Sequence, residues 1–189
     1  MKRARPTKKD YIEARKLAAV YNMVPNLVWS ILHLTPVVVY SWNEIEPFKI
    51  YILLGISVLL GILPAGFYNW MQFSKTTAAY KKVGILMIRK YSQDGDLIIQ
   101  QVRKKYPFYK VVESRDAIIR YIGRTYVYER FHFMVLMYML MVLGVTLYRQ
   151  AFVWAIVLLL NNVCYNFYPL LLQQYNRLRL ITLLKRSRP

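Results

Sequence analysis

FHFMVLMYMLMVLGVTLYRQAFVWAIVLLLNNVCYNFYPLLLQQYN, residues 131–176, contains a single charged side chain, that of Arg149. A helix needs about 20 predominantly apolar residues to cross the hydrocarbon core of a bilayer. The uncharged runs on the two sides of Arg149, residues 131–148 and 150–176, are each close to or above that length. Because the connection at 148–150 is so short, the stretch predicts two antiparallel membrane-spanning helices.

Two earlier runs, residues 17–43 and 50–74, also lack Asp, Glu, Lys and Arg. The chain as a whole is 57% hydrophobic and only 19% charged, which is too apolar for a soluble domain of 189 residues. We therefore predict an all-α integral membrane protein with one membrane domain, residues 1–189. Its four transmembrane helices are expected at about 22–42, 50–70, 131–148 and 151–172.

The net charge of +18 has a strongly uneven distribution. Residues 1–16, 72–130 and 177–189 hold 25 of the 27 Lys and Arg, whereas the two remaining connections hold only Lys49 and Arg149. Basic loops stay on the cytoplasmic side of a membrane, so both termini and the large middle segment are expected there, with the first span as a retained anchor. The long uncharged runs exclude a soluble nucleic-acid binder, so nucleic acid is not an expected partner.

The middle segment, 73–130, combines apolar residues near helical spacing with Lys and Arg. It predicts two or three amphipathic helices on the cytoplasmic face, where their basic sides meet anionic lipid head groups. Alternatively, some of Arg103–Lys105 holds a phosphorylated substrate or carrier. In SQDGD, residues 92–96, Gly95 predicts a helix stop and Asp94 or Asp96 the next N-cap, rather than a metal-binding D-x-D motif.

Ionisable side chains at the start of the third span are candidates for catalysis. In YERFHF, residues 128–133, Glu129 and His132 are three residues apart and share a helix face with Tyr128. A histidine placed there can take a proton from a hydroxyl while a carboxylate fixes its tautomer. The structural alternative is a salt bridge of Glu129 with Arg124, Arg130 or His132. His33, alone in the first span, is expected to be a packing residue.

The fourth span is unusual for its asparagines. Asn162 and Asn166 share a helix face, with Asn161 about 100° away, and carboxamides in lipid need partners from other helices or from a polar ligand. Pro169 is expected to kink or end the helix. The polar track then continues to the membrane edge. The candidate substrate-binding residues are Asn162, Asn166, Tyr168, Tyr175, Asn176, Arg177 and Arg179. No metal site is expected, because Cys164 is the only cysteine.

The tail N-x-Y-P-x-x-x-Q-x-Y-N-R-x-R-L, residues 166–180, is similar to the C-terminal motif of the glycosyl-diaponeurosporenoate acyltransferases of staphyloxanthin-type carotenoid synthesis. The E-x-x-H at Glu129 and His132 also resembles that family, as does, more weakly, Y-K-K-x-G…K…D-G at 80–95. The resemblance covers roughly the last two thirds of the chain. Gln174 and Leu178 depart from it, since the family often has Arg and Pro there.

The resemblance implies transfer of a fatty acyl group to a sugar hydroxyl of a glycosylated terpenoid, in a bacterial cell membrane. We accordingly expect an acyltransferase with His132 as general base, Glu129 orienting it, and asparagines around the sugar or the acyl carbonyl. Arg177, Arg179 and the basic middle helices would hold the phosphates of an acyl thioester donor, with no bound cofactor. The alternatives are a membrane scaffold or partner subunit, with the asparagines used only in packing, and a lipid or terpenoid transporter subunit. The oligomeric state stays open.

Overall fold

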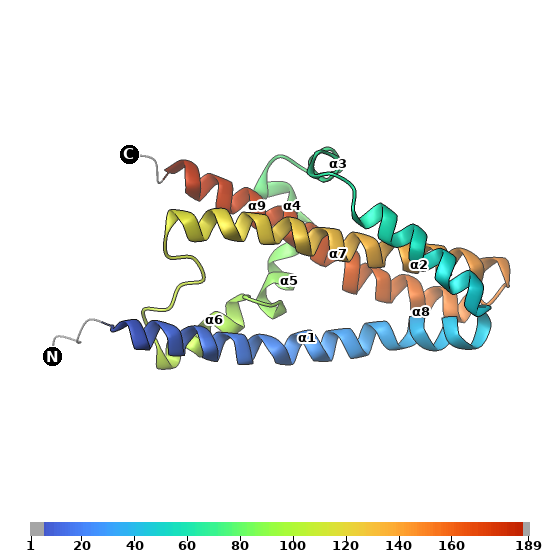
Figure 1. The fold of residues 1–189 in the computed structure, drawn as a ribbon, viewed down its shortest axis with the longest axis horizontal. Helices are drawn as coiled ribbons and strands as arrows, with labels where there is room; N and C mark the ends of the chain where they lie inside the picture. Colours follow the sequence, from blue (N-terminus) through green and yellow to red (C-terminus); the bar gives the residue numbers. More distant parts are fainter. Residues whose placement is uncertain (1–5, 187–189) are drawn as a thin grey trace.

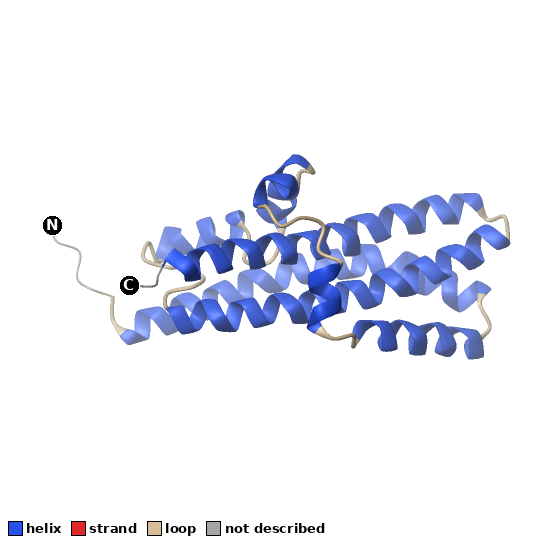
Figure 2. Ribbon diagram, turned by 90° about the horizontal axis from the view of Figure 1, so that it is seen from above, coloured by secondary structure: helices blue, strands red, loops and turns tan. Residues whose placement is uncertain are grey.

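The computed structural model describes residues 6–186, and three long helical rods dominate it (Figure 1). The first is α1, Lys8–Glu44, and the second is α7, Arg115–Tyr148. The third is continuous from Phe152 to Arg186 and consists of α8 (Phe152–Asn162), the π-helical turn η1 (Val163–Phe167) and α9 (Tyr168–Arg186). Apart from its connecting loops, the described chain is helical and has no strand (Figure 2).

These three rods are long and apolar enough to cross a membrane. The predicted spans 22–42, 131–148 and 151–172 lie within them. The prediction of one helix over 50–70 differs from the structure, in which α2 (Pro47–Gly61) ends after 15 residues and α3 (Ala65–Trp70) follows. Pro64, between the two, has no N–H to continue the helical ladder. A charge-free run does not reveal such a break.

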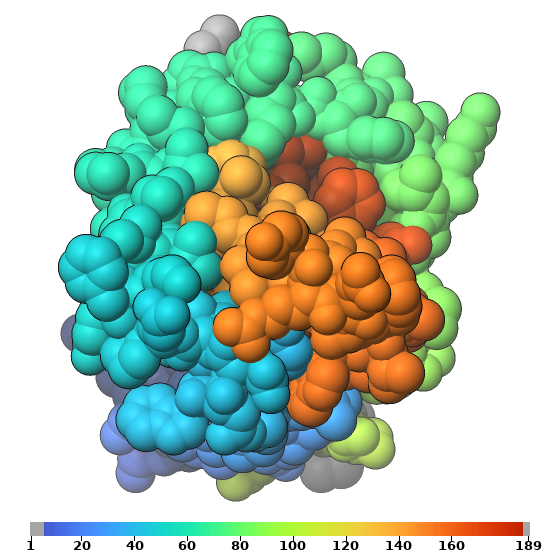
Figure 3. Space-filling model, turned by 90° about the vertical axis from the view of Figure 1, so that its right-hand side faces the viewer, coloured from blue at the N-terminus to red at the C-terminus, as the bar shows by residue number. Residues whose placement is uncertain are grey.

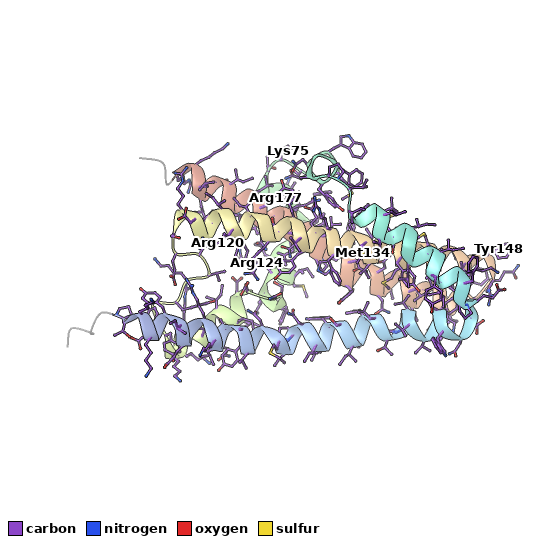
Figure 4. The ribbon with its side chains drawn as sticks, viewed as in Figure 1. Lys75, Arg120, Arg124, Met134, Tyr148 and Arg177 are labelled. Carbon is purple, nitrogen blue, oxygen red and sulfur yellow. The ribbon has the colours of Figure 1, made fainter. Side chains whose placement is uncertain are left out.

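Figure 3 looks onto the end where α1 joins α2 and α7 joins α8, and several large apolar side chains near this end are exposed. Trp42, Phe48 and Val153 are all more than 70% exposed, and Tyr148 extends from the same end (Figure 4). Exposed apolar surface of this extent is typical of a surface that contacts lipid. Inside, Val37 and Tyr40 of α1 pack with Met139, Val142 and Leu158 of α7 and α8.

The opposite half of the molecule contains the short helices and the basic residues. The helices there are α4 (Thr77–Lys82), α5 (Ile85–Tyr91) and α6 (Asp96–Lys105). They lie at the end where α1 begins and α9 finishes, which agrees with the amphipathic helices predicted for 73–130 (Figure 1). Tyr80 and Ile85 pack against α9, and Val102 packs against α1, so these helices link two rods.

The break at residues 92–96 is held by contacts that the sequence did not reveal. Gly95 is the N-cap of α6, and a Cβ on it would lie 2.1 Å from the Arg89 carbonyl oxygen, so only glycine fits. Asp94 and Asp96 are not N-caps, contrary to the prediction. Asp96 begins α6 and pairs with Arg89, while Asp94 bonds to α1 and α7.

Candidate functional site

Glu129 lies fully buried between α7 and α9. Its Oε2 accepts a hydrogen bond from Nη1 of Arg177, and its Oε1 accepts one from Nε2 of Gln174 at 2.8 Å. The guanidinium of Arg177, labelled in Figure 4, also stacks on the ring of Tyr126, with its central carbon 4.1 Å from the ring centroid. A buried carboxylate requires a cation and hydrogen-bond donors. Arg177 and Gln174 meet that requirement and bind α7 to α9.

This geometry corrects two expectations. Glu129 was expected to orient His132, but among the described residues no hydrogen bond joins them, because both Glu129 oxygens accept from α9. The alternative expectation was an ion pair of Glu129 with Arg124 or Arg130, and the structure does not show that pair. The partner is Arg177, 48 residues along the chain. Arg177 was expected to hold a donor phosphate, yet its guanidinium is buried against Glu129 and Tyr126.

Gln174 extends the same network to the short helices. Its Oε1 accepts hydrogen bonds from the Tyr80 hydroxyl at 2.9 Å and from the Phe73 main-chain N–H at 3.1 Å. The Tyr80 hydroxyl oxygen in turn accepts a hydrogen bond from the Ser74 main-chain N–H at 3.2 Å. The buried Glu129 network therefore fixes the position of α9 relative to α4 and to the loop before it. These contacts hold α7, α9 and the segment around Tyr80 together.

His132 faces the π-helical turn of the third rod. Its ring meets the Tyr165 ring edge-on, with centroids 5.8 Å apart, and lies beside the Tyr165 main chain and the Asn166 side chain. The residue is half-buried, but its Nδ1 is buried and has no hydrogen-bond partner, and the same is true of Oδ1 of Asn166. Buried polar atoms are rarely left unpaired. The two atoms, an imidazole nitrogen and an amide oxygen, belong to neighbouring side chains and are the polar groups that a ligand would meet at this place.

The third rod changes its hydrogen-bond pattern at this site, through η1 just before Pro169. Proline has no N–H, so Pro169 cannot donate to the Tyr165 carbonyl four residues earlier. The helix continues across the proline, with a π turn at 163–167 immediately before it. Pro169 was expected to kink or end the helix, and the structure shows the π turn instead. Such turns often occur at functional sites.

The side chains of the three asparagines form hydrogen bonds with different partners. Asn162 Nδ2 donates to the Leu136 carbonyl of α7 at 3.2 Å, and Asn166 Nδ2 donates to Asn162 Oδ1 at 2.8 Å and contacts Met139 Sδ. Asn161 faces α1 instead. The helix-packing alternative therefore describes Asn162, whereas Asn166 has a free acceptor oxygen beside His132.

His33 lies next to the same site and is buried between helices, as expected of a packing residue. Its Nδ1 lies 2.6 Å from Asn161 Oδ1, and its ring stacks on Tyr165 with centroids 5.7 Å apart. The Ser30 hydroxyl lies 2.9 Å from the Tyr165 hydroxyl. The two histidines thus flank one tyrosine from α1 and α7. The signal was present in the sequence, since Asn22, Asn26, Ser30 and His33 recur on one face of α1.

The remaining candidate residues lie farther along α9. Tyr168 and Asn176 are half-buried. Tyr175 is buried against Tyr80, with ring centroids 6.2 Å apart, and the exposed Arg179 lies over the outer side of Tyr175. Within residues 6–186, no three His, Cys, Asp or Glu side chains converge as metal ligands would.

The family model for glycosyl-4,4'-diaponeurosporenoate acyltransferase matches residues 64–186, about two thirds of the chain. The chain belongs to this family. The acyltransferase match extends from α3 to α9 and includes His132, Tyr165, Asn166 and the Glu129 network, but not α1, which carries His33. No curated protein and no solved structure matches the chain. The resemblance seen in the tail and in E-x-x-H is thereby confirmed at the level of the family.

Proposed function

We propose that the chain is a membrane-bound acyltransferase that moves a fatty acyl group from a thioester donor to a sugar hydroxyl of a glycosylated carotenoid or related terpenoid. The membership of the family supports the reaction class, and three long apolar helices support a membrane location. The observation that carries the site assignment is the unpaired His132 Nδ1 beside the unpaired Asn166 Oδ1. The apolar part of the acceptor lies between helices or in lipid, and its sugar reaches this point.

His132 is the general base of the proposed reaction. Its Nδ1 accepts the proton of the sugar hydroxyl as the hydroxyl oxygen attacks the thioester carbonyl carbon. The tetrahedral intermediate then collapses, the carbon–sulfur bond breaks, and the leaving thiolate takes the proton back from His132. The products are the ester and the free thiol. The Asn166 Oδ1 accepts a second hydroxyl of the sugar and holds the attacking oxygen in place.

Stabilisation of the oxyanion needs a hydrogen-bond donor, and we first expected the asparagines to supply it. Their amide N–H groups, however, are committed to Leu136, Met139 and to one another. The Tyr165 hydroxyl lies 2.9 Å from the Ser30 hydroxyl, and its O–H can donate to a ligand when Ser30 donates to Tyr165. We assign it to the carbonyl oxygen of the donor. Glu129 acts only through the position of α7 and α9.

A scaffold subunit with asparagines used purely for packing is the alternative from the sequence. Packing alone would be expected to satisfy the polar atoms that it buries, because an unpaired buried polar group costs about 1–3 kcal/mol. Nη2 of Arg177, however, is also buried without a partner in a packing contact, so it is the family match that favours the enzyme. The apolar acceptor and the thioester donor are partners in this proposal, and anionic lipids remain the expected surroundings of the basic helices.

The test is lipid mass spectrometry on membranes that contain the full chain. A glycosylated carotenoid and a fatty acyl thioester are supplied, and the same carotenoid without its sugar serves as the control acceptor. The proposal expects an acyl-sized mass gain on the glycosylated acceptor only. A gain on the sugar-free carotenoid, or no gain on either acceptor from a correctly inserted chain, would contradict it.

A further inference from the structure

A cavity of about 490 Å³ lies between α1 and α7, nearer the start of both helices than the His132 site. It has the size of a small-molecule site. Four segments line it: α1 from Arg15 to Met23 and at Asn26, the turn at Gln93 and Asp94, the connection at 109–111, and α7 from Ala117 to Arg124. Parts of the chain about 100 residues apart therefore build one concave surface.

The charge of this cavity is one-sided. Its lining contains four cationic side chains, Arg15, Lys110, Arg120 and Arg124, and one acid, Asp94. Both oxygens of Asp94 are already bonded, Oδ1 to Asn22 Nδ2 at 2.8 Å and Oδ2 to the Tyr121 hydroxyl at 2.9 Å. Asp94 thus holds the wall together and offsets one positive charge, and Arg15 pairs with Glu113 at 3.2 Å, so the cavity keeps a net positive charge from Lys110, Arg120 and Arg124. A concave site lined by one sign of charge concentrates ligands of the opposite sign.

The cations also differ in how they are held. Arg124 donates to the Tyr128 hydroxyl at 2.8 Å and stacks on Tyr121, which orients its guanidinium. Within residues 6–186, Arg120 and Lys110 make no ion pair or hydrogen bond. Figure 4 shows Arg120 and Arg124 on the side of α7 that faces α1. Guanidinium groups in such a setting recognise phosphate oxygens through paired N–H bonds.

The cavity and the His132 site are joined along one face of α1. Asn22 and Asn26 line the cavity, and Ser30 and His33, on the same face, bond to Tyr165 and Asn161. At 1.5 Å per residue, the 11 residues from Asn22 to His33 span about 16 Å. A ligand with its charged head in the cavity and a long flexible arm has a polar path to the reacting groups.

We propose that this cavity binds a phosphate-bearing group, which in the reaction above is the head of the acyl thioester donor. The inference rests on the proposed function for the identity of the donor, but phosphate binding is measurable without turnover. The proposal replaces the phosphate site that was expected at Arg177 and Arg179. The new site consists of Arg15, Lys110, Arg120 and Arg124. A phosphorylated lipid head group presents the same chemistry, so the experiment has to separate the two sources.

The test uses the full chain in nanodiscs of neutral lipid, with coenzyme A as the soluble probe and anionic phospholipid as the membrane-bound one. Lys110→Gln/Arg120→Gln removes two charges from the cavity. Lys82→Gln/Arg115→Gln removes two exposed charges that do not line it. We expect the cavity variant to bind coenzyme A at least ~10-fold more weakly, through loss of charge-assisted bonds, and the control within ~2-fold of wild type. Lys110→Arg/Arg120→Lys, which keeps both charges, should retain most of the affinity.

Equal losses in the two double variants would overturn the proposal, because net charge alone would then explain binding. Unchanged binding of both probes in a folded cavity variant would also overturn it. If the cavity variant lost binding of anionic lipid but kept binding of coenzyme A, the cavity would still be a phosphate site, and its ligand would be the lipid head group. If coenzyme A binds through the cavity but no acyl product forms, the phosphate site stands and the proposed function fails.

Discussion

Glu129 and Arg177, 48 residues apart in the chain, form a buried ion pair that joins α7 to α9. Removing one partner of a buried pair leaves an uncompensated charge, which costs about 3–5 kcal/mol. We therefore expect Arg177→Met to lower the free energy of unfolding by about that amount, measured by titration with a denaturing detergent in mixed micelles. Glu129→Gln/Arg177→Met should recover much of the loss, because no buried charge remains.

An exposed pair provides the control for that prediction. Arg15 and Glu113 lie 3.2 Å apart with side chains 65% and 27% exposed, and such pairs contribute only about 0–1 kcal/mol. Glu113→Gln should therefore unfold within about 1 kcal/mol of wild type. If Arg177→Met were no more destabilised than Glu113→Gln, the structural function given to the Glu129 network would be wrong.

Substitution of Asn162 and of Asn166 tests separately whether each side chain acts in helix packing or in ligand binding. Asn162→Leu removes a hydrogen bond between α8 and α7, and such bonds in membranes contribute about 0.6 kcal/mol on average and up to about 1.7. Asn166→Leu removes the unpaired Oδ1 beside His132. We expect Asn162→Leu to act mainly on stability and Asn166→Leu to lower the rate of acyl transfer at least ~10-fold by loss of positioning. Steady-state kinetics and unfolding titrations of both variants check this.

The scaffold alternative makes the opposite prediction for Asn166. A side chain used only for packing can be replaced by Leu in lipid without loss of activity. Full acyl transfer by Asn166→Leu, at wild-type KM and kcat, would therefore exclude Asn166 from the site.

His33 is a positioning residue in this account, because it bonds to Asn161 and stacks on Tyr165 without an assigned proton transfer. His33→Phe keeps an aromatic ring but removes the bond to Asn161. We expect it to lower kcat while the acidic limb of the pH–rate profile stays where it is in wild type. His132→Gln should abolish that limb, because the titrating base is gone. A shift of the limb in His33→Phe would make His33 part of the proton transfer.

Tyr121 provides a pH prediction at the end of the molecule that contains the short helices. Burial, together with the charge of Asp94, raises the pKa of the Tyr121 hydroxyl above its ordinary value of about 10. A raised pKa in the folded state means that the stabilising contribution is complete below about pH 10 and is lost as the pH rises further. Wild type should therefore lose stability above pH 10, and Tyr121→Phe should lose less, in unfolding titrations across that range.

Much of the fold could be predicted from the sequence, because a helix that crosses lipid must be long and nearly free of charged side chains. Charge-free runs correctly predicted the apolar segments within α1, α7 and the third rod. The break after Gly61 was missed because Pro64 interrupts the backbone ladder without adding a charge. The tail and E-x-x-H motifs led to the correct family, because they lie within the matched region.

The arrangement of the site was less accessible, because it depends on helix rotation. A spacing of three residues placed Glu129 and His132 on one face, but it could not show that Arg177 and Gln174 would supply partners for the carboxylate. His33 was assigned to packing because no acid is near it in sequence. Its contacts with Asn161 and Tyr165 come from residues more than 120 positions away.

The most direct test of the central claim compares the initial rate of acylated product from wild type with that from His132→Ala, at equal inserted amounts in one lipid composition. General bases typically contribute about 10²–10⁴-fold to a rate. We expect His132→Ala to lose at least ~100-fold while it inserts and unfolds like wild type. A His132→Ala rate within ~2-fold of wild type, outside the range of a general base, would contradict the assignment of His132 to the reaction.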